Sequence, residues 1–144
     1  MENKLIFAKE IIKEAGAFIK ESLSKTITVE EKTAFDDLVT NIDKQTQDLL
    51  VARIKSAFPS DNIFAEENGL VHNIKDGNVW VLDPIDGTVN FIVQQDNFCV
   101  MIAYYEEGQG KFGFIYNVMA DQLFYGGGQF DVYCNDKLLP AYKN

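Results

Sequence analysis

A short run in the middle of the chain combines residues that bind metal ions with residues that bind phosphate. The run is Asp83–Thr88, with the sequence Asp-Pro-Ile-Asp-Gly-Thr, and it follows the apolar stretch Trp80–Leu82. Carboxylates are preferred ligands of hard cations such as Mg²⁺, and free backbone amides at the start of a helix bind phosphate oxygens. The sequence therefore indicates a place where a metal and a phosphate lie side by side, which is what the hydrolysis of a phosphate ester requires.

Most residues of this run have a plausible role in binding the metal or the phosphate. Asp83 ends a predicted strand, so the sheet fixes its backbone, and Asp86 can then project towards the same cation. The carbonyl oxygen of Ile85 is a third candidate ligand. Gly87 lets the backbone approach an anion closely, and its amide with that of Thr88 would face a phosphate. A structural alternative is that Asp83 caps a turn and Asp86 caps the helix that follows.

Spacing excludes three other kinds of site. An EF-hand loop with Gly87 at its sixth position would need a glutamate at its twelfth, where this chain has Val93. An aspartyl-phosphate nucleophile of the haloacid dehalogenase type uses Asp-x-Asp, whereas two residues separate the aspartates here. The run Gly126–Gly128 lacks the Lys-Ser/Thr that follows a P-loop, so it predicts a flexible turn.

Two more acidic segments lie N-terminal to this run. One is Asp37–Asp43, DLVTNID, which follows Lys32, and the other is Phe64–Glu67, FAEE. Together with Trp80–Phe91, WVLDPIDGTVNF, these segments resemble the inositol monophosphatase family, which comprises magnesium-dependent, lithium-sensitive sugar and inositol phosphatases. The likeness runs over essentially all 144 residues. The Asn-Phe ending favours the inositol monophosphatase branch over the fructose bisphosphatase and nucleotide phosphatase branches.

The resemblance implies a set of metal ligands. Glu66, Asp83 and the Ile85 carbonyl would hold the first Mg²⁺, and Asp83 with Asp86 would hold part of a second. A complete family member would bind two or three Mg²⁺ ions, with Mn²⁺ as an alternative and Li⁺ as an inhibitor. Glu67 would support the site by orienting the ligands.

The resemblance also implies the chemistry. The Thr88 hydroxyl, hydrogen-bonded to Asp43, would polarise a metal-bound water that attacks the phosphorus, and Glu66 would help to orient this water. Lys32 and Asp37 would lie on a loop that closes over the metals. The expected substrate is inositol monophosphate or a similar small polyol or sugar phosphate, and the expected assembly is a homodimer.

Hydrophobic periodicity predicts the elements that position these residues. Apolar residues at three- and four-residue steps predict an amphipathic helix over about residues 4–24. Ser24–Asp37 reads as a strand or loop, and Thr40 or Asn41 would cap a second helix that Pro59 ends. Its predicted inner face consists of Leu49, Leu50, Ile54 and Phe58.

A sheet is predicted from the second half of the chain. Short strands are expected at residues 63–66, 79–83, 98–105, 112–116, 123–125 and 132–134. The run 98–105 is continuously apolar, which predicts a strand covered on both faces. The fold class is therefore α+β, with two helices packed on one largely antiparallel sheet, and the resemblance makes this the N-terminal part of a layered αβαβα fold.

Composition narrows the partners and the compartment. Thirteen basic and 22 acidic residues give a net charge of −9, which argues against nucleic acid or an anionic membrane as a partner. No apolar run is long enough to span a membrane. Cys99 and Cys134 have no Cys-x-x-Cys spacing and predict buried, reduced thiols. A soluble cytoplasmic protein is expected.

Family members continue into a second segment of comparable size that carries a Trp-Asp-x-Ala-Ala-Gly-like motif. This motif is absent here, so residues 1–144 are expected to form an N-terminal metal- and phosphate-binding domain of a shortened protein with weak or no turnover. Two alternatives stay open. One is a non-catalytic metal- or phosphate-binding scaffold of the same fold, and the other is a related phosphatase that acts on a sugar bisphosphate or histidinol phosphate.

Overall fold

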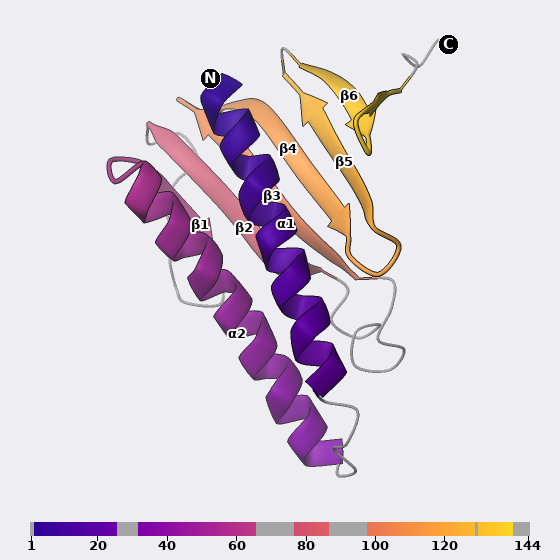
Figure 1. Ribbon diagram of the computed structural model, residues 1–144. Helices are drawn as coiled ribbons and strands as arrows, with labels where there is room; N and C mark the ends of the chain where they lie inside the picture. The colour runs from indigo at the N-terminus through magenta and orange to yellow at the C-terminus, as the bar shows by residue number, and fades with distance from the viewer. Residues whose placement is uncertain (1, 26–31, 66–76, 87–97, 129, 140–144) are drawn as a thin grey trace.

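The computed structural model of the chain has two helices side by side on one face of a single seven-stranded sheet (Figure 1). It describes residues 2–25, 32–65, 77–86, 98–128 and 130–139, with the backbone alone for residues 2, 23–25, 32–40 and 84–86. The arrangement confirms the predicted α+β layer of two helices on a largely antiparallel sheet.

Helix α1 spans Glu2–Lys25 and packs over the middle of the sheet. Its buried face follows the predicted three- and four-residue steps and contains Ala8, Ile11, Ile12, Ala15 and Ile19. Neither of the described helices is long and apolar enough to cross a membrane.

Helix α2 spans Lys32–Ala57, so it begins well before the cap predicted at Thr40 or Asn41. The strand or loop predicted over Ser24–Asp37 is therefore wrong from Lys32 onwards. No glycine or proline interrupts the sequence between Lys32 and Asn41. Threonine and asparagine inside a helix cost only about 0.5 kcal/mol each relative to alanine, so the helix extends through them.

The strands lie across the sheet in chain order. They are β1 (Asn62–Ala65), β2 (Asn78–Asp86), β3 (Cys99–Glu106), β4 (Gln109–Asn117), β5 (Gln122–Gly127), β6 (Phe130–Cys134) and β7 (Lys137–Leu138). β1 and β2 are parallel, and every other neighbouring pair is antiparallel. The sequence did not predict β7, which is too short for a hydrophobic pattern. Asn135 and Asp136 form its hairpin turn with positive φ angles of 50° and 68°.

The pleat of the strands separates a face covered by the helices from an open face. On β2, Trp80 and Leu82 are buried against the helices, so Val81 and Asp83 belong to the other face. On this face Val79 is buried, Val81 is partly exposed and Asp83 is exposed. The residues of β3 on this face are of intermediate exposure, so the expectation that β3 is covered on both sides stays a prediction. The two cysteines, predicted to be buried, are thiols of intermediate exposure and are not disulfide-bonded.

Polar bonds fix one end of the helix layer to the sheet. The Asp61 carboxylate, which is 6% exposed, accepts hydrogen bonds from Lys4 Nζ at 2.7 Å and Trp80 Nε1 at 2.9 Å. Lys4 Nζ also donates to the Tyr104 hydroxyl at 2.7 Å. Burial on its own would lower the pKa of Lys4, but the hydrogen bonds to Asp61 and Tyr104 raise it above its ordinary value. Asp61 thus ties the first turn of α1 to β2.

A glycine brings α1 close to the sheet. The Tyr116 ring lies against the backbone at Gly16, where a Cβ atom would come within 2.4 Å of a ring carbon. At the far end of the ring the Tyr116 hydroxyl donates to Asp121 at 2.5 Å. Burial and this hydrogen bond raise the pKa of Tyr116 to about 12, so the hydroxyl stays protonated at neutral pH.

We expect Asp61→Asn to lower the free energy of unfolding by about 2 kcal/mol, because Lys4 then keeps a partly buried charge without a counterion. The matched control is Asp136→Asn, which removes the same charge from the more exposed pair with Lys9. That change should cost no more than about 0.5 kcal/mol. Urea denaturation of the two variants measures both values, and equal losses would contradict this ranking.

The open face should make the purified chain self-associate, because large exposed apolar patches drive association. Ile115, Phe124 and Val132 on this face are 43%, 36% and 46% exposed. Sedimentation velocity over a range of concentrations should show oligomers for the wild type and fewer for Phe124→Lys. Ile6→Lys, at an exposed position of α1, is the control and should leave association unchanged. A wild-type chain that stays monomeric throughout would refute the prediction.

Candidate metal and phosphate site

The aspartates of the central run lie at the carboxyl end of β2. Asp83 is exposed and pairs with Met101 of β3, whereas Asp86 pairs with Cys99. Three steps on β2 therefore oppose two steps on β3, which is a β-bulge with one extra residue. Positions 83 and 86 would fall on opposite faces of a regular strand. The bulge returns the register position of Asp86 to the open face that carries Asp83.

Helix α2 supplies the third acidic residue of this end of the fold. α2 runs antiparallel to β2, and its C-terminal end is fixed there because Phe58 stacks on Trp80 with ring centroids 6.0 Å apart. Asp43 lies about 22 Å back along the helix from Phe58 at 1.5 Å per residue. Asp86 lies about 20 Å along β2 from Trp80 at 3.3 Å per residue. Asp43 and Asp86 therefore occupy about the same level along the length of the layer.

The inner face of α2 changes character along its length. Leu50 and Ile54 are buried in the C-terminal half, as predicted, and Leu49 and Phe58 pack beside them. Near the middle of the helix the buried side chains include the polar residues Asp43, Thr46 and Gln47. Thr46 and Gln47 were not among the predicted site residues. The signal was available, because they follow Asp43 by three and four residues and so share its face.

The other predicted site residues divide into two groups. Glu66, Glu67, Gly87 and Thr88 lie outside the described residues, so their roles stay predictions. Lys32 and Asp37, which were expected on a loop, lie instead within α2. Because this stretch continues as a helix, the expected position on a loop is wrong. The described residues contain no group of three or more His, Cys, Asp or Glu side chains placed to hold a metal.

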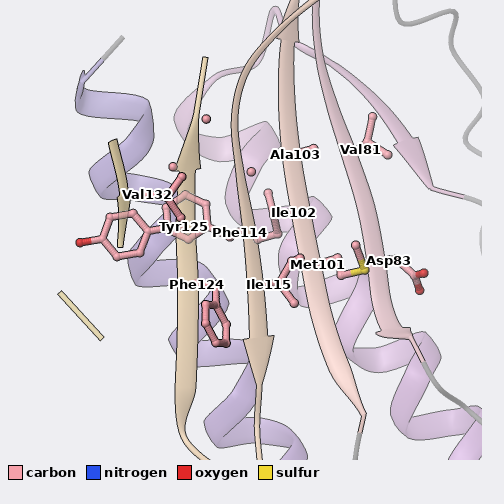
Figure 2. A pocket seen from close by; sticks show the side chains of 13 residues that line it. Val81, Asp83, Met101, Ile102, Ala103, Phe114, Ile115, Phe124, Tyr125 and Val132 are labelled. Atoms are coloured by element: carbon pink, nitrogen blue, oxygen red, sulfur yellow. The ribbon is translucent and has the colours of Figure 1, made fainter. Parts of the chain in front are cut away.

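A shallow depression of about 530 Å³ lies on the open face beside Asp83 (Figure 2). Ala103, Gly113 and Gly126 pair across β3, β4 and β5 and leave its floor without large side chains. Asp83 is at the β2 side of the depression and is the one charged residue in its described lining. A phosphate needs hydrogen-bond donors or cations. The depression is therefore an apolar surface beside the candidate site and not the phosphate site itself.

Comparisons with known proteins show the family to which the chain is related. The family model described as "Inositol monophosphatase family" matches residues 1–144. The chain is 44% identical over 138 residues to the inositol-1-monophosphatase of Bacillus subtilis, covering 94% of this chain and 52% of that protein. It is 35% identical over 131 residues to a fructose-1,6-bisphosphatase/inositol-1-monophosphatase of Thermotoga maritima, covering 89% and 50%.

Solved structures give the same result. Inositol monophosphatase II from Staphylococcus aureus superposes with a TM-score of 0.90 at 36% identity, covering all of this chain and 52% of that one. A complex described as inositol monophosphate bound to SaIMPase-II matches at 34% identity with a TM-score of 0.81, covering 96% and 49%. An IMPase/NADP phosphatase complexed with Mg²⁺ and phosphate matches at 30% identity with a TM-score of 0.63, covering 67% and 37%.

The chain spans about half the length of the curated relatives that it matches. Within that half the match is continuous and includes every acidic segment singled out above. The helices and the sheet also superpose on those of a solved relative. The chain therefore belongs to the inositol monophosphatase family.

Proposed function

We propose that this chain carries the magnesium- and phosphate-binding half of a phosphomonoesterase. The observation that carries the proposal is the bulge in β2, which puts the register positions of Asp83 and Asp86 on one face at the level of Asp43. Family membership supports it, because the homologues are phosphatases of this family.

The available donors fit a hard divalent cation. Asp83 offers an exposed carboxylate on a rigid strand end, and the bulge supplies a backbone carbonyl at Ile85. Carboxylate and carbonyl oxygens are the ligands that Mg²⁺ prefers. We assign Glu66, Asp83 and the Ile85 carbonyl to one ion and Asp83 with Asp86 to part of a second. Glu67 would orient these ligands, and Lys32 and Asp37 would act from the first turns of α2.

Side chains and backbone amides of the chain would orient the attacking water and bind the phosphate. Magnesium, when bound, supplies the positive charge that stabilises the phosphoryl oxygens and activates water for attack. Asp43, 8% exposed inside the layer, would accept the hydrogen bond of the Thr88 hydroxyl and hold it in one orientation. The amides of Gly87 and Thr88 would bind the phosphate oxygens. Glu66 would orient the attacking water.

The substrate class follows from the relatives. A homologous structure binds inositol monophosphate, and a relative is named for both fructose-1,6-bisphosphate and inositol-1-phosphate hydrolysis. We therefore propose inositol monophosphate or a similar small polyol phosphate, with a sugar bisphosphate as the second candidate. Sensitivity to Li⁺, use of Mn²⁺, a cytoplasmic location and a homodimer stay predictions from the sequence.

We expect the 144-residue chain to release little or no phosphate from inositol monophosphate, with or without MgCl₂, because half of the relatives' length is not represented in it. A coding sequence that continues past Asn144 should yield a protein that hydrolyses this ester with Mg²⁺ and is inhibited by Li⁺. The measurement is phosphate release across a panel of phosphate esters. Robust Mg²⁺-dependent turnover by the 144-residue chain would contradict the first expectation.

Asp83→Asn should weaken Mg²⁺ binding by more than about 100-fold, since residues that only orient metal ligands already contribute about 10- to 100-fold. Isothermal titration with MgCl₂ measures this on the chain itself. The control is Asp131→Asn, which removes an exposed carboxylate on β6 far from the site and should leave affinity unchanged. Equal affinities of the Asp83→Asn variant and the wild type would remove Asp83 from the site.

A further inference from the structure

Gln47 is a buried polar side chain that its described surroundings do not explain. It is fully buried on the inner face of α2. Within the described part of the chain, neither its amide nitrogen nor its carbonyl oxygen has a hydrogen-bond partner. Buried polar groups are nearly always hydrogen-bonded because leaving one unpaired is costly. Gln47 therefore needs a partner that the described residues do not provide in this arrangement.

The helix around Gln47 does not provide that partner. The hydroxyl of Thr46 is already engaged, since it donates to the Ile42 carbonyl at 2.7 Å. One turn further along, Leu50 is apolar and buried. The backbone groups in the middle of α2 bond to one another along the helix. Within the described part of the chain α2 packs on α1 and on β2, so these are the elements on which a partner can lie.

The level of Gln47 in the layer identifies what lies across from it. Gln47 is about 16 Å back along α2 from Phe58 at 1.5 Å per residue. Ile85 is about 16 Å along β2 from Trp80 at 3.3 Å per residue. Phe58 and Trp80 are stacked, so Gln47 lies level with Ile85. This is the bulge, where the ladder to β3 is interrupted and backbone groups of β2 lose their regular partners.

We propose that Gln47 is a positioning residue for the metal site: its amide hydrogen-bonds the backbone of the β2 bulge and holds the Ile85 carbonyl in place for a divalent cation. The inference rests on the proposed function. A side-chain amide both donates and accepts, so it can serve an N–H and a C=O of the bulge together. Gln47 gains these bonds when the cation orders the bulge, so its amide contributes to metal binding and not to the metal-free fold.

The test separates those two contributions. Gln47→Met keeps the length of the side chain and removes both polar atoms. We expect Mg²⁺ affinity of the 144-residue chain, titrated with MgCl₂, to fall about 10-fold or more. The melting temperature without metal should stay unchanged or rise, because an unpaired buried group has been removed. Gln45→Met, at an exposed position of the same helix, is the matched control and should change neither value.

Affinity of the Gln47→Met variant equal to that of the wild type would overturn the proposal, whatever happens to its melting temperature. If the variant fails to fold, the wild-type chain provides the decisive measurement. The side-chain amide resonances of Gln47 in a ¹⁵N-labelled sample should shift on addition of MgCl₂, while those of Gln45 stay in place. If the chain binds Mg²⁺ and the Gln47 resonances do not shift, the role proposed for Gln47 is overturned, but the proposed metal site is not. No Mg²⁺ binding by the wild type would overturn the proposed metal site as well.

Discussion

The pleat of β2 determines which residues of this strand join the core and which lie at the candidate metal site. A strand that buries Trp80 and Leu82 against the helices must turn the alternate positions to the other face, so Asp83 is on the open side by construction. Trp80 is held by rings on α1, β3 and β4, by the ring of Phe58 directly after α2, and by the Asp61 carboxylate. A slip of one residue would put Asp83 inside the helix layer and Trp80 in solvent, which the burial energy of the indole forbids. The position of the first candidate ligand is thus determined by packing on the opposite face of the sheet.

The inner face of α2 shows how one helix serves both stability and chemistry. Towards its C-terminal end the helix packs Leu50 and Ile54 into the core, whereas its middle buries Asp43 and Gln47. Buried polar groups of this kind reduce the stability that an apolar stripe would provide. They are concentrated at the end of the layer where β2 bulges and its aspartates lie. The domain therefore has a well-packed end, where aromatic rings surround Trp80, and a polar end, where the candidate metal ligands lie.

Much of this organisation was predictable from the residues. The periodicity of α1 and the position of β2 followed from hydrophobic spacing, because the core demands it. The beginning of α2 at Lys32 did not follow, since Thr40 and Asn41 looked like a cap and only the absence of helix-breaking residues argued otherwise. The bulge could not be read from Asp-x-x-Asp, because an odd spacing on a regular strand places the two acids on opposite faces. Gln47 was missed because a search for catalytic acids passes over a neutral amide.

The contact between Gly16 and Tyr116 has a consequence for the far end of α1. The Tyr116 ring is held at its hydroxyl by Asp121, so it cannot move aside for a larger residue on the helix. Sliding α1 by one position would bring the methyl group of Ala15 or Ala17 into the ring. The close contact between Gly16 and Tyr116 therefore fixes the position of α1 along β4. The same contact determines the position of Lys4, which lies about 18 Å from Gly16 along the helix at 1.5 Å per residue. It therefore places the Lys4 ammonium group within hydrogen-bond distance of Asp61.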